Sequence, residues 1–369
     1  MTENRLNQTP NEQGYRMPAE WHRHGATQLH WPSNKETWPG ERLVRVEEVF
    51  LNIIEALYLF EPVILLADPP AVTRAKKSLK ERNLDRSRIH LYRQPLNDMW
   101  ARDCGPIFIR RETISGEEFA ITDWEYNAWG GKYSPYEKDN HLPKWFVEQF
   151  QIPYFQADMV LEGGAIDSNG DGVLLTTESV LLNPNRNPEM SRVDIDRKLR
   201  DYLGIEKIIW LKKGLAGDDT DGHIDDLARF LNKNTILAMR VDDPGDINYV
   251  TLKTNLDLLK KASDTNNRPF QIETLPLPET KIKGTTVDGS GYVPASYANF
   301  YVANGVVLVP LYDHRSDPLA LKLFRKYFPE RKVIGIPCMD LVWGQGSIHC
   351  VTQQLFQVTD HKDPDREYY

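Results

Sequence analysis

The chain has 369 residues, of which 40% are hydrophobic and 27% charged, a composition typical of a soluble globular protein. No apolar run approaches the roughly 18 residues that a membrane-spanning helix needs. The formal net charge of −8 argues against a nucleic-acid partner and favours a cationic substrate. The composition therefore predicts a protein that binds neither nucleic acid nor membranes.

Composition changes little along the chain, so we expect one large domain rather than two. Residues 1–14 are polar and lack the apolar segment of a signal peptide, which predicts a flexible N-terminal arm. Residues 360–369 predict a charged C-terminal tail, and residues 15–359 a single domain. A homo-oligomer is compatible with this organisation.

The cysteines are few and odd in number: Cys104, Cys338 and Cys350. This count argues against a disulfide framework and for a reducing compartment, so we expect a cytoplasmic protein. The sequence contains no CxxC pair and no HExxH motif. A metal site therefore has no support from the sequence.

The first hundred residues alternate between strand and helix patterns. Residues 26–31 predict a short strand, and apolar residues at helical spacing predict a helix over residues 42–60. Residues 63–67 predict a buried strand, residues 70–81 a second helix and residues 89–93 a further strand. This β-α-β-α-β order indicates a mixed α/β architecture.

A hairpin-like unit then recurs, in which two β-prone runs are joined by a turn such as Asn-Gly or Asp-Gly. The units cover residues 105–122, 162–177, 222–239 and 296–310. The run that begins at Cys350 would open a fifth hairpin, completed by the strand at residues 26–31. Between the hairpins, helices are predicted at residues 144–150, 192–203, 250–263 and 318–328, and strands at residues 207–210 and 332–336.

Each unit begins near one polar residue, and these residues lie roughly 50 to 75 positions apart. They are Asp103, Glu162, His223, Asn299 and Cys350. Such a period predicts a radial, propeller-like ring of ββαβ units. The polar residues at the unit starts would then converge on one axis.

Cys350 follows a glycine-containing run, Trp343-Gly-Gln-Gly-Ser-Ile-His-Cys350. Gly344 and Gly346 allow the backbone to fold tightly beside a ligand. We expect Cys350 on the first residue of a strand, held rigidly and facing a cleft. The alternative is a small buried hydrophobic residue, since cysteines are often fully buried.

The axis would combine a thiol, an imidazole and three carboxylates. His223 and Asp225 are two residues apart, so on a strand they would face the same side. A cysteine beside a histidine suits a nucleophile with an acid/base partner. Two of the three carboxylates would suit the forked N–H donors of a guanidinium, whose charge would lower the thiol pKa.

Each of these residues also has a structural interpretation. Asp103 could form a turn paired with Arg102, Glu162 could be a surface charge, and His223 could end a strand without a further role. Their shared position in a repeat favours the catalytic interpretation.

Eight stretches, which together span nearly the whole chain, resemble the agmatine deiminases of the guanidino-group-modifying (pentein) superfamily and the related bacterial peptidylarginine deiminases. They are Met17-Pro-Ala-Glu-Trp21, Trp100-Ala-Arg-Asp-Cys-Gly-Pro106, Asn127-Ala-Trp-Gly-Gly-Lys132, Leu161-Glu-Gly-Gly164, Leu181-Leu-Asn-Pro-Asn-Arg-Asn-Pro188, Thr220-Asp-Gly-His-Ile-Asp225, Tyr297-Ala-Asn-Phe-Tyr301 and Gly346-Ser-Ile-His-Cys-Val-Thr-Gln-Gln354.

The resemblance implies a five-bladed α/β propeller and a hydrolase that converts agmatine to N-carbamoylputrescine and ammonia, without a metal or organic cofactor. It implies that Cys350 forms a covalent amidino-thioether, with His223 as general acid/base oriented by Glu162. Asp103 and Asp225 would bind the guanidinium. Trp100 would line the substrate channel, with Trp129 and Asp219 as further substrate-binding residues.

Two alternatives remain. A peptidylarginine or free-arginine deiminase would need a cationic or polar clamp for a carboxylate, for which Arg186 and Lys132 are the nearest candidates. A non-catalytic pentein that only binds a partner would be expected to lack the cysteine and histidine. Asp218, Asp219 and Asp221, just before His223, predict an acidic rim that favours agmatine, which carries an ammonium and no carboxylate.

Overall fold

The computed structural model describes residues 8–84, 87–358 and 366–367. Most of the predicted arm and tail lies outside these residues. Residues 8–14 pack on the domain, where the Asn11 N–H donates to the Asp201 carbonyl at 2.9 Å. None of the described helices combines the length and apolar character needed to cross a membrane.

The strands of the described residues form one five-stranded and four three-stranded sheets. In the three-stranded sheets the first two strands are antiparallel and the third is parallel to the second. The strands are β4 (Ile107–Thr113), β5 (Gly116–Glu125) and β6 (Tyr154–Val160); β7 (Asp167–Ser168), β8 (Val173–Thr177) and β9 (Lys207–Leu211); β10 (Ala228–Asn232), β11 (Thr235–Arg240) and β12 (Gln271–Pro276); β13 (Tyr301–Ala303), β14 (Val306–Leu311) and β15 (Lys332–Pro337).

The five-stranded sheet contains the same arrangement, built from both ends of the chain. Its order is β16-β1-β2-β3-β17. β1 (Ala26–His30) is antiparallel to β16 (Thr352–Leu355) and parallel to β2 (Val63–Ala67). β3 (Ile89–Arg93) and β17 (Arg366–Glu367) complete the sheet. The predicted pairing of the N-terminal strand with the strand after Cys350 is therefore confirmed.

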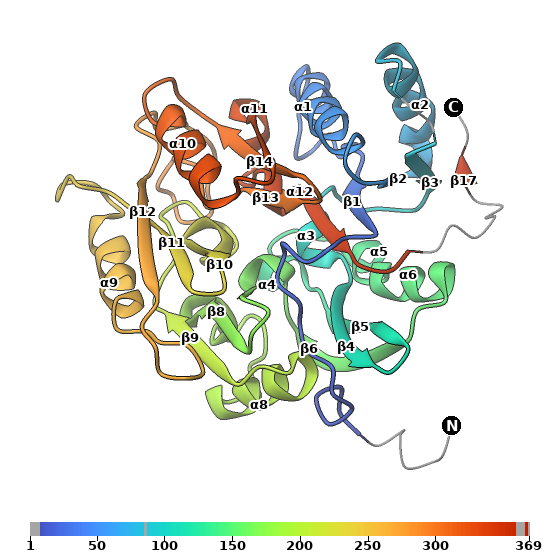
Figure 1. Cartoon of the computed structure of the whole chain (residues 1–369). Coiled ribbons are helices and arrows are strands. Elements are labelled where there is room, and N and C mark those ends of the chain that lie inside the picture. Colours follow the sequence, from blue (N-terminus) through green and yellow to red (C-terminus); the bar gives the residue numbers. More distant parts are fainter. Residues whose placement is uncertain (1–7, 85–86, 359–365, 368–369) are drawn as a thin grey trace.

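A helix connects the two parallel strands in each of the five units. These helices are α1 (Arg42–Leu57), α6 (Leu142–Phe150), α8 (Arg192–Leu203), α9 (Tyr249–Leu259) and α10 (Asp317–Tyr327), and α2 (Val72–Glu81) precedes β3. The apolar faces of these helices are buried, as the helical spacing of α1 predicts. In Figure 1 the long helices lie on the outside and the sheets surround a common centre.

Short helical segments occupy that centre. They are α3 (Ala101–Cys104), η3 (Gly163–Ala165), η4 (Ile224–Asp226) and α12 (Ile348–Val351). α3 packs against α12 and η3, and η3 packs against η4. Each segment immediately precedes or opens a hairpin, so the starts of several units meet at one place.

Two local predictions are wrong. Cys350 lies in α12, and strand β16 begins two residues later, at Thr352. His223 and Asp225 are not on a strand either, because His223 precedes η4 and Asp225 lies within it. In both places a side chain takes the backbone hydrogen bond that a neighbouring strand would otherwise provide. The His349 N–H donates to Asn299 Oδ1, and the His223 N–H donates to Asp218 Oδ2.

A group of buried charges lies beneath these central segments. Arg229 on β10, 1% exposed, donates from Nε to Asp167 Oδ1 and from Nη2 to Glu20 Oε2, both at 2.8 Å. Arg102 Nη2 donates to the same Glu20 oxygen at 3.4 Å. Breaking a buried ion pair leaves an uncompensated charge, which is costlier than losing a surface pair.

We expect Arg229→Met to lower the free energy of unfolding by about 3–5 kcal/mol, because Glu20 and Asp167 lose their shared partner. Urea denaturation followed by circular dichroism measures the change. Arg240→Met on the next strand is the matched control, since its pair with Asp242 is exposed to solvent and should contribute less than about 1 kcal/mol. Equal effects of the two substitutions would contradict the structural role of Arg229.

Candidate active site

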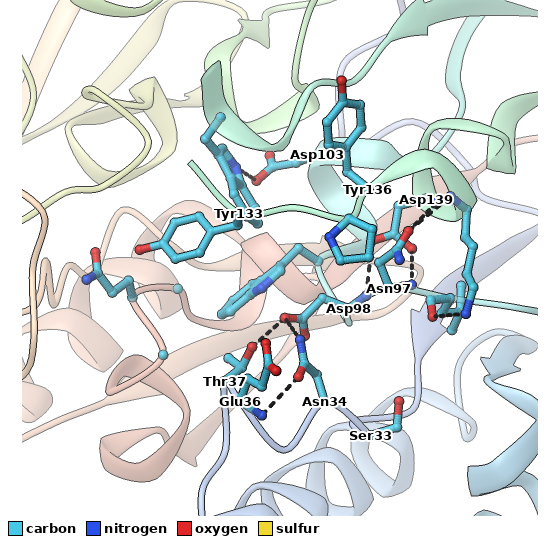
Figure 2. Close-up of a pocket in the computed structure, with 18 of the residues that line it drawn as sticks. Ser33, Asn34, Glu36, Thr37, Asn97, Asp98, Asp103, Tyr133, Tyr136 and Asp139 are labelled. Carbon is cyan, nitrogen blue, oxygen red and sulfur yellow. Dashed lines mark hydrogen bonds between the residues drawn. The ribbon is translucent and has the colours of Figure 1, made fainter. Parts of the chain in front are cut away.

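A cavity of about 800 Å³ leads from the surface to the centre of the molecule. The buried residues that line it include Trp100, Asp103, Trp129, Asp219 and Cys350. Its outer part is lined by the loops 33–37 and 133–139. Figure 2 shows part of this lining, including Asp103 and the hydrogen-bonded carboxylates of Asp98 and Asp139.

Asp103 is held by hydrogen bonds to both carboxylate oxygens. Its Oδ2 accepts from Trp129 Nε1 at 2.9 Å, and its Oδ1 accepts from the Gly164 N–H at 3.0 Å. Burial raises the pKa of Asp103 to about 7, and these two hydrogen bonds oppose the rise. Near neutral pH this carboxyl group is therefore protonated in part of the molecules.

Trp129 reaches Asp103 from an unusual backbone conformation. Residues 128–131, labelled α4 in Figure 1, all have positive φ: 54° at Ala128, 56° at Trp129, 86° at Gly130 and 76° at Gly131. The Gly130 N–H donates to Asn127 Oδ1 at 2.8 Å, which helps to hold this turn. The left-handed region is unfavourable for residues with a Cβ, so the turn is strained at Ala128 and Trp129.

Asp225 is fully buried. Its Oδ2 lies 2.7 Å from His349 Nδ1, within hydrogen-bond distance, whereas Oδ1 has no hydrogen-bond partner among the described residues. Burial and the neighbouring Asp103 raise the pKa of Asp225 well above its usual range. Both effects would be offset by a cation placed between the two carboxylates.

Gly164 shows how closely the site residues converge. A Cβ atom built on this glycine would lie 2.5 Å from His223 Nδ1 and 2.7 Å from Asp103 Oδ1. The same atom would lie 3.1 Å from Asp225 Oδ2. Only a residue without a side chain allows the backbone to approach all three groups, so these side chains surround one small space.

Cys350 is buried beside Asp225. The thiol lies 3.8 Å from Asp225 Oδ2, and its Sγ accepts from Asn299 Nδ2 at 3.1 Å. Burial raises the pKa of Cys350 well above its usual range, and Asp225, Asp226 and Asp103 add to the rise. Without a cation nearby the thiol is therefore protonated at neutral pH.

Neither ring nitrogen of His223 has a hydrogen-bond partner within the described part of the chain. The ring is 1% exposed, and its Nδ1 lies 3.6 Å from Asp103 Oδ1. Burial and the charge of Arg186 lower the pKa of His223 well below its usual range, so the imidazole is neutral. A neutral imidazole can accept a proton.

Glu162 is also fully buried, and its Oε1 is paired with Arg186 Nε at 2.5 Å. Its Oε2 has no partner among the residues that the structure describes, and those residues include no hydrogen bond between Glu162 and His223. Asp103, Asp225 and Cys350 nevertheless lie in the central segments, and Glu162 and His223 immediately precede η3 and η4, so the unit starts meet as the repeat pattern predicts.

Of the three acids expected to form a rim, Asp219 lines the cavity, whereas Asp218 and Asp221 do not. Asp219 accepts from the Tyr133 hydroxyl at 2.5 Å and from the Val287 N–H at 2.7 Å. Lys132 Nζ pairs with Asp221 Oδ1 at 2.7 Å. Arg186 Nη1 pairs with the other Asp221 oxygen at 2.8 Å. Neither of these cations lines the cavity, and both are neutralised by carboxylates.

Aromatic side chains form the apolar wall. Trp100 and Trp129 meet edge to face with ring centroids 6.3 Å apart, and Trp38 lies 6.3 Å from Trp100 on the other side. Such a wall suits the methylene chain of a substrate whose ends are polar. Trp100 and Trp129 thus both lie where the sequence predicts a substrate channel.

Three residues of the site did not emerge as site residues from the sequence. Asn299 contacts the thiol, His349 contacts Asp225, and Glu20 Oε2 accepts from His349 Nε2 at 2.7 Å. Each belongs to one of the stretches that carry the family resemblance, and Asn299 opens the fourth hairpin unit. The position of Asn299 in the repeat was therefore a usable signal, whereas the contacts of His349 and Glu20 depend on the tertiary structure.

Comparison with known proteins defines the family. The chain matches the model of the Porphyromonas-type peptidyl-arginine deiminase family over residues 16–355. The match covers most of the chain, and the chain belongs to this family.

Individual relatives agree along the whole length. A Legionella pneumophila protein named "Putative agmatine deiminase" is 37% identical over 359 residues, which cover 97% of this chain and 99% of the relative. The solved agmatine deiminase of Enterococcus faecalis superposes with a TM-score of 0.87 at 32% identity, over 95% of this chain and 98% of that one. The C. jejuni agmatine deiminase solved with substrate gives 0.80 at 32% identity, over 93% and 97%. The chain therefore has the α/β fold of these enzymes.

Proposed function

We propose that this protein is an agmatine deiminase, which hydrolyses the guanidinium of agmatine to N-carbamoylputrescine and ammonia, a reaction of polyamine metabolism that leads toward putrescine. The observation that carries the proposal is the convergence of the Cys350 thiol, the Asp103 and Asp225 carboxylates and the His223 imidazole around one small buried space. The full-length similarity to agmatine deiminases supports it.

In this proposal residues 15–359 form one catalytic domain, with the five ββαβ units as the blades of a propeller. The arrangement of the sheets around a common centre supports this reading (Figure 1).

Binding of the substrate would begin with a charge match. The planar guanidinium would donate hydrogen bonds to Asp103 and Asp225. The raised pKa values of these two carboxyl groups fall when a cation lies beside them. The same cation lowers the pKa of the Cys350 thiol. Trp100 and Trp129 would line the path of the methylene chain, and Asp219 would face the distal ammonium.

The chemistry would take two steps through a covalent intermediate. The neutral His223 accepts the thiol proton as Cys350 Sγ forms a bond to the guanidinium carbon. Collapse of the tetrahedral adduct breaks a C–N bond, and His223 returns that proton to the departing ammonia. His223 then deprotonates a water that attacks the amidino-thioether carbon, and cleavage of the C–S bond releases the carbamoyl product.

Glu162 would orient His223 during these transfers. Its Oε2 and both imidazole nitrogens are buried without partners in the described part of the chain. Each would gain a hydrogen bond when substrate and water occupy the site. Arg186 holds the other Glu162 oxygen and keeps the carboxylate in place.

Replacing the proposed nucleophile, Cys350, tests the proposed function. Cys350→Ala should abolish ammonia release from agmatine, because no other thiol contacts Asp225. Cys104→Ala and Cys338→Ala are matched controls that should retain most activity. Cys104 donates to the Trp100 carbonyl and Cys338 is fully buried, and neither carries an assigned role in the reaction.

Acid quenching during turnover should show added mass on the peptide that contains Cys350, measured by mass spectrometry. Residual turnover in Cys350→Ala, or an adduct on another residue, would rule out the covalent mechanism.

We expect kcat/KM for agmatine to fall as the pH drops below about 7, the pKa to which burial raises Asp103. A raised carboxyl pKa means that the group is protonated below that value, and only the ionised form can pair with the guanidinium. Since kcat/KM reports ionisations of the free enzyme, a profile measured from pH 5 to 9 shows this limb. A flat profile down to pH 5 would contradict a role for Asp103 in binding the cation.

We expect agmatine to be preferred over arginine by at least about a hundredfold in kcat/KM, which corresponds to about 3 kcal/mol. The substrates differ by the α-carboxylate of arginine, which would face the like charge of Asp219 in the cavity wall. Lys132 and Arg186, the candidate clamps for a carboxylate, are both paired with acids away from the cavity.

The assay compares agmatine, arginine and a peptide ending in arginine at equal low concentrations. Comparable rates for arginine or the peptide would favour the alternative of a free-arginine or peptidylarginine deiminase and leave the deiminase chemistry intact.

A further inference from the structure

Asn299 is in direct contact with the sulfur of Cys350. Its Nδ2 lies 3.1 Å from Cys350 Sγ, within hydrogen-bond range for a sulfur acceptor, and both residues are buried. The two residues come from different units, since Asn299 precedes β13 and Cys350 lies in α12. The contact thus forms only in the folded protein.

The surroundings of Asn299 determine which end of its amide faces the sulfur. Its Oδ1 accepts from the backbone N–H groups of His349 and Cys350, at 2.9 and 3.3 Å. Its Nδ2 also donates to Asp226 Oδ1 at 3.0 Å. A flipped amide would direct its NH2 at two N–H donors and its oxygen at a carboxylate, so the network fixes Nδ2 toward the sulfur.

The chemical consequence follows from the two hydrogens on Nδ2. One is used by Asp226 and the other is directed at Cys350 Sγ. A thiolate is a much better acceptor than a thiol, because hydrogen bonds to charged groups are stronger than those to neutral ones. Three carboxyl groups, from Asp103, Asp225 and Asp226, oppose a negative charge on this sulfur. Asn299 is a donor that favours it.

We propose that Asn299 is a further catalytic residue, whose side-chain amide donates a hydrogen bond to Cys350 Sγ and stabilises it both as the attacking thiolate and as the leaving thiolate. This inference rests on the proposed function. Asp226 acts as a positioning residue, which orients the amide through its second hydrogen. When a guanidinium occupies Asp225, the thiol loses that acceptor at 3.8 Å and keeps Asn299 Oδ1 at 3.5 Å, and the Nδ2 donor remains in place.

Asn299 also has a structural role, since its Oδ1 caps two N–H groups at the start of α12. The test must separate the two roles. Asn299→Asp keeps the oxygen that accepts from His349 and Cys350 but has no hydrogen to offer the sulfur: an ionised carboxylate has none, and the single proton of the acid form is taken by Asp226. Asn299→Ala removes both functions.

The first readout is the ionisation of Cys350 without substrate. The rate of its alkylation by iodoacetamide is followed from pH 6 to 11 by mass spectrometry of the Cys350 peptide. We expect the midpoint of this titration to rise by about one to two pH units in Asn299→Asp and Asn299→Ala. Asp226→Asn should shift it in the opposite direction, because a carboxylate near the sulfur is removed while an acceptor for Asn299 is kept.

Asn299→Asp adds a carboxyl group beside the sulfur, so its shift combines the lost donor with an added charge, whereas Asn299→Ala removes the donor without adding a charge. The other titratable groups near the sulfur, apart from Asp226 in its own variant, are unchanged. They are Asp103 on α3, Asp225 and Asp226 on η4, His223 before η4 and His349 in α12. The shifts can therefore be assigned to position 299 or 226.

The second readout is turnover of agmatine, where we expect kcat to fall by about 100-fold or more in Asn299→Asp, as for the loss of one donor to a developing anion. An Asn299→Asp variant with wild-type alkylation midpoint and kcat would overturn the proposal and leave Asn299 as a cap for α12. Because alkylation needs no substrate, this result is distinct from a failure of the wild-type protein to deiminate agmatine, which would overturn the proposed function.

Discussion

The architecture depends on a buried carboxylate, Glu20. Its Oε2 accepts from Arg229, Arg102 and His349, and its Oε1 accepts from the Val302 N–H at 2.7 Å. Burial alone would raise the pKa of Glu20, but the charge of Arg229 holds this pKa well below its usual range. Glu20, which precedes the first strand, thereby connects α3, β10, β13 and α12. Removing charges from water is costly, so these segments are stable only when all of them are assembled.

This structural cluster is continuous with the candidate site. Arg102 precedes Asp103 in α3, and His349 precedes Cys350 in α12. The His349 ring lies between two carboxylates, with Nε2 at Glu20 and Nδ1 at Asp225, both at 2.7 Å. Arg102 and His349 thus belong to the buried cluster around Glu20, while their neighbours Asp103 and Cys350 line the cavity. The positions of the reactive groups therefore depend on the hydrogen bonds and ion pairs that neutralise the buried charges around Glu20.

Much of the fold could be predicted from local signals. The helix at Arg192–Leu203 and the strands at Val63–Ala67 and Ile89–Arg93 match their predicted bounds, because apolar periodicity and nearby glycine or proline residues define them. The hairpins were predictable from their turns. The strand β12 was not, since residues 271–276 are mostly half-exposed and lack a clear alternation.

The candidate site could be predicted in its composition but not in its local geometry. The recurrence of a polar residue at each unit start brought Asp103, Glu162, His223 and Cys350 together correctly. The helical turn at Cys350 could not be predicted, because Asn299, which caps it, is 51 residues away. The partner of Glu162 was likewise hidden, since its pairing with Arg186 depends on the packing of two loops.

The left-handed turn at residues 128–131 shows that the chain does not maximise its own stability. Four successive positive φ angles, two of them at residues with a Cβ, are retained where the Trp129 indole must reach Asp103. Strain of this kind persists only when the surrounding structure enforces it. Engineering for thermal tolerance would therefore select relaxed backbones at this turn, and those variants would lose control of the carboxylate that Trp129 holds. At these four residues, higher stability of the backbone and accurate placement of the Asp103 carboxylate are therefore opposing requirements.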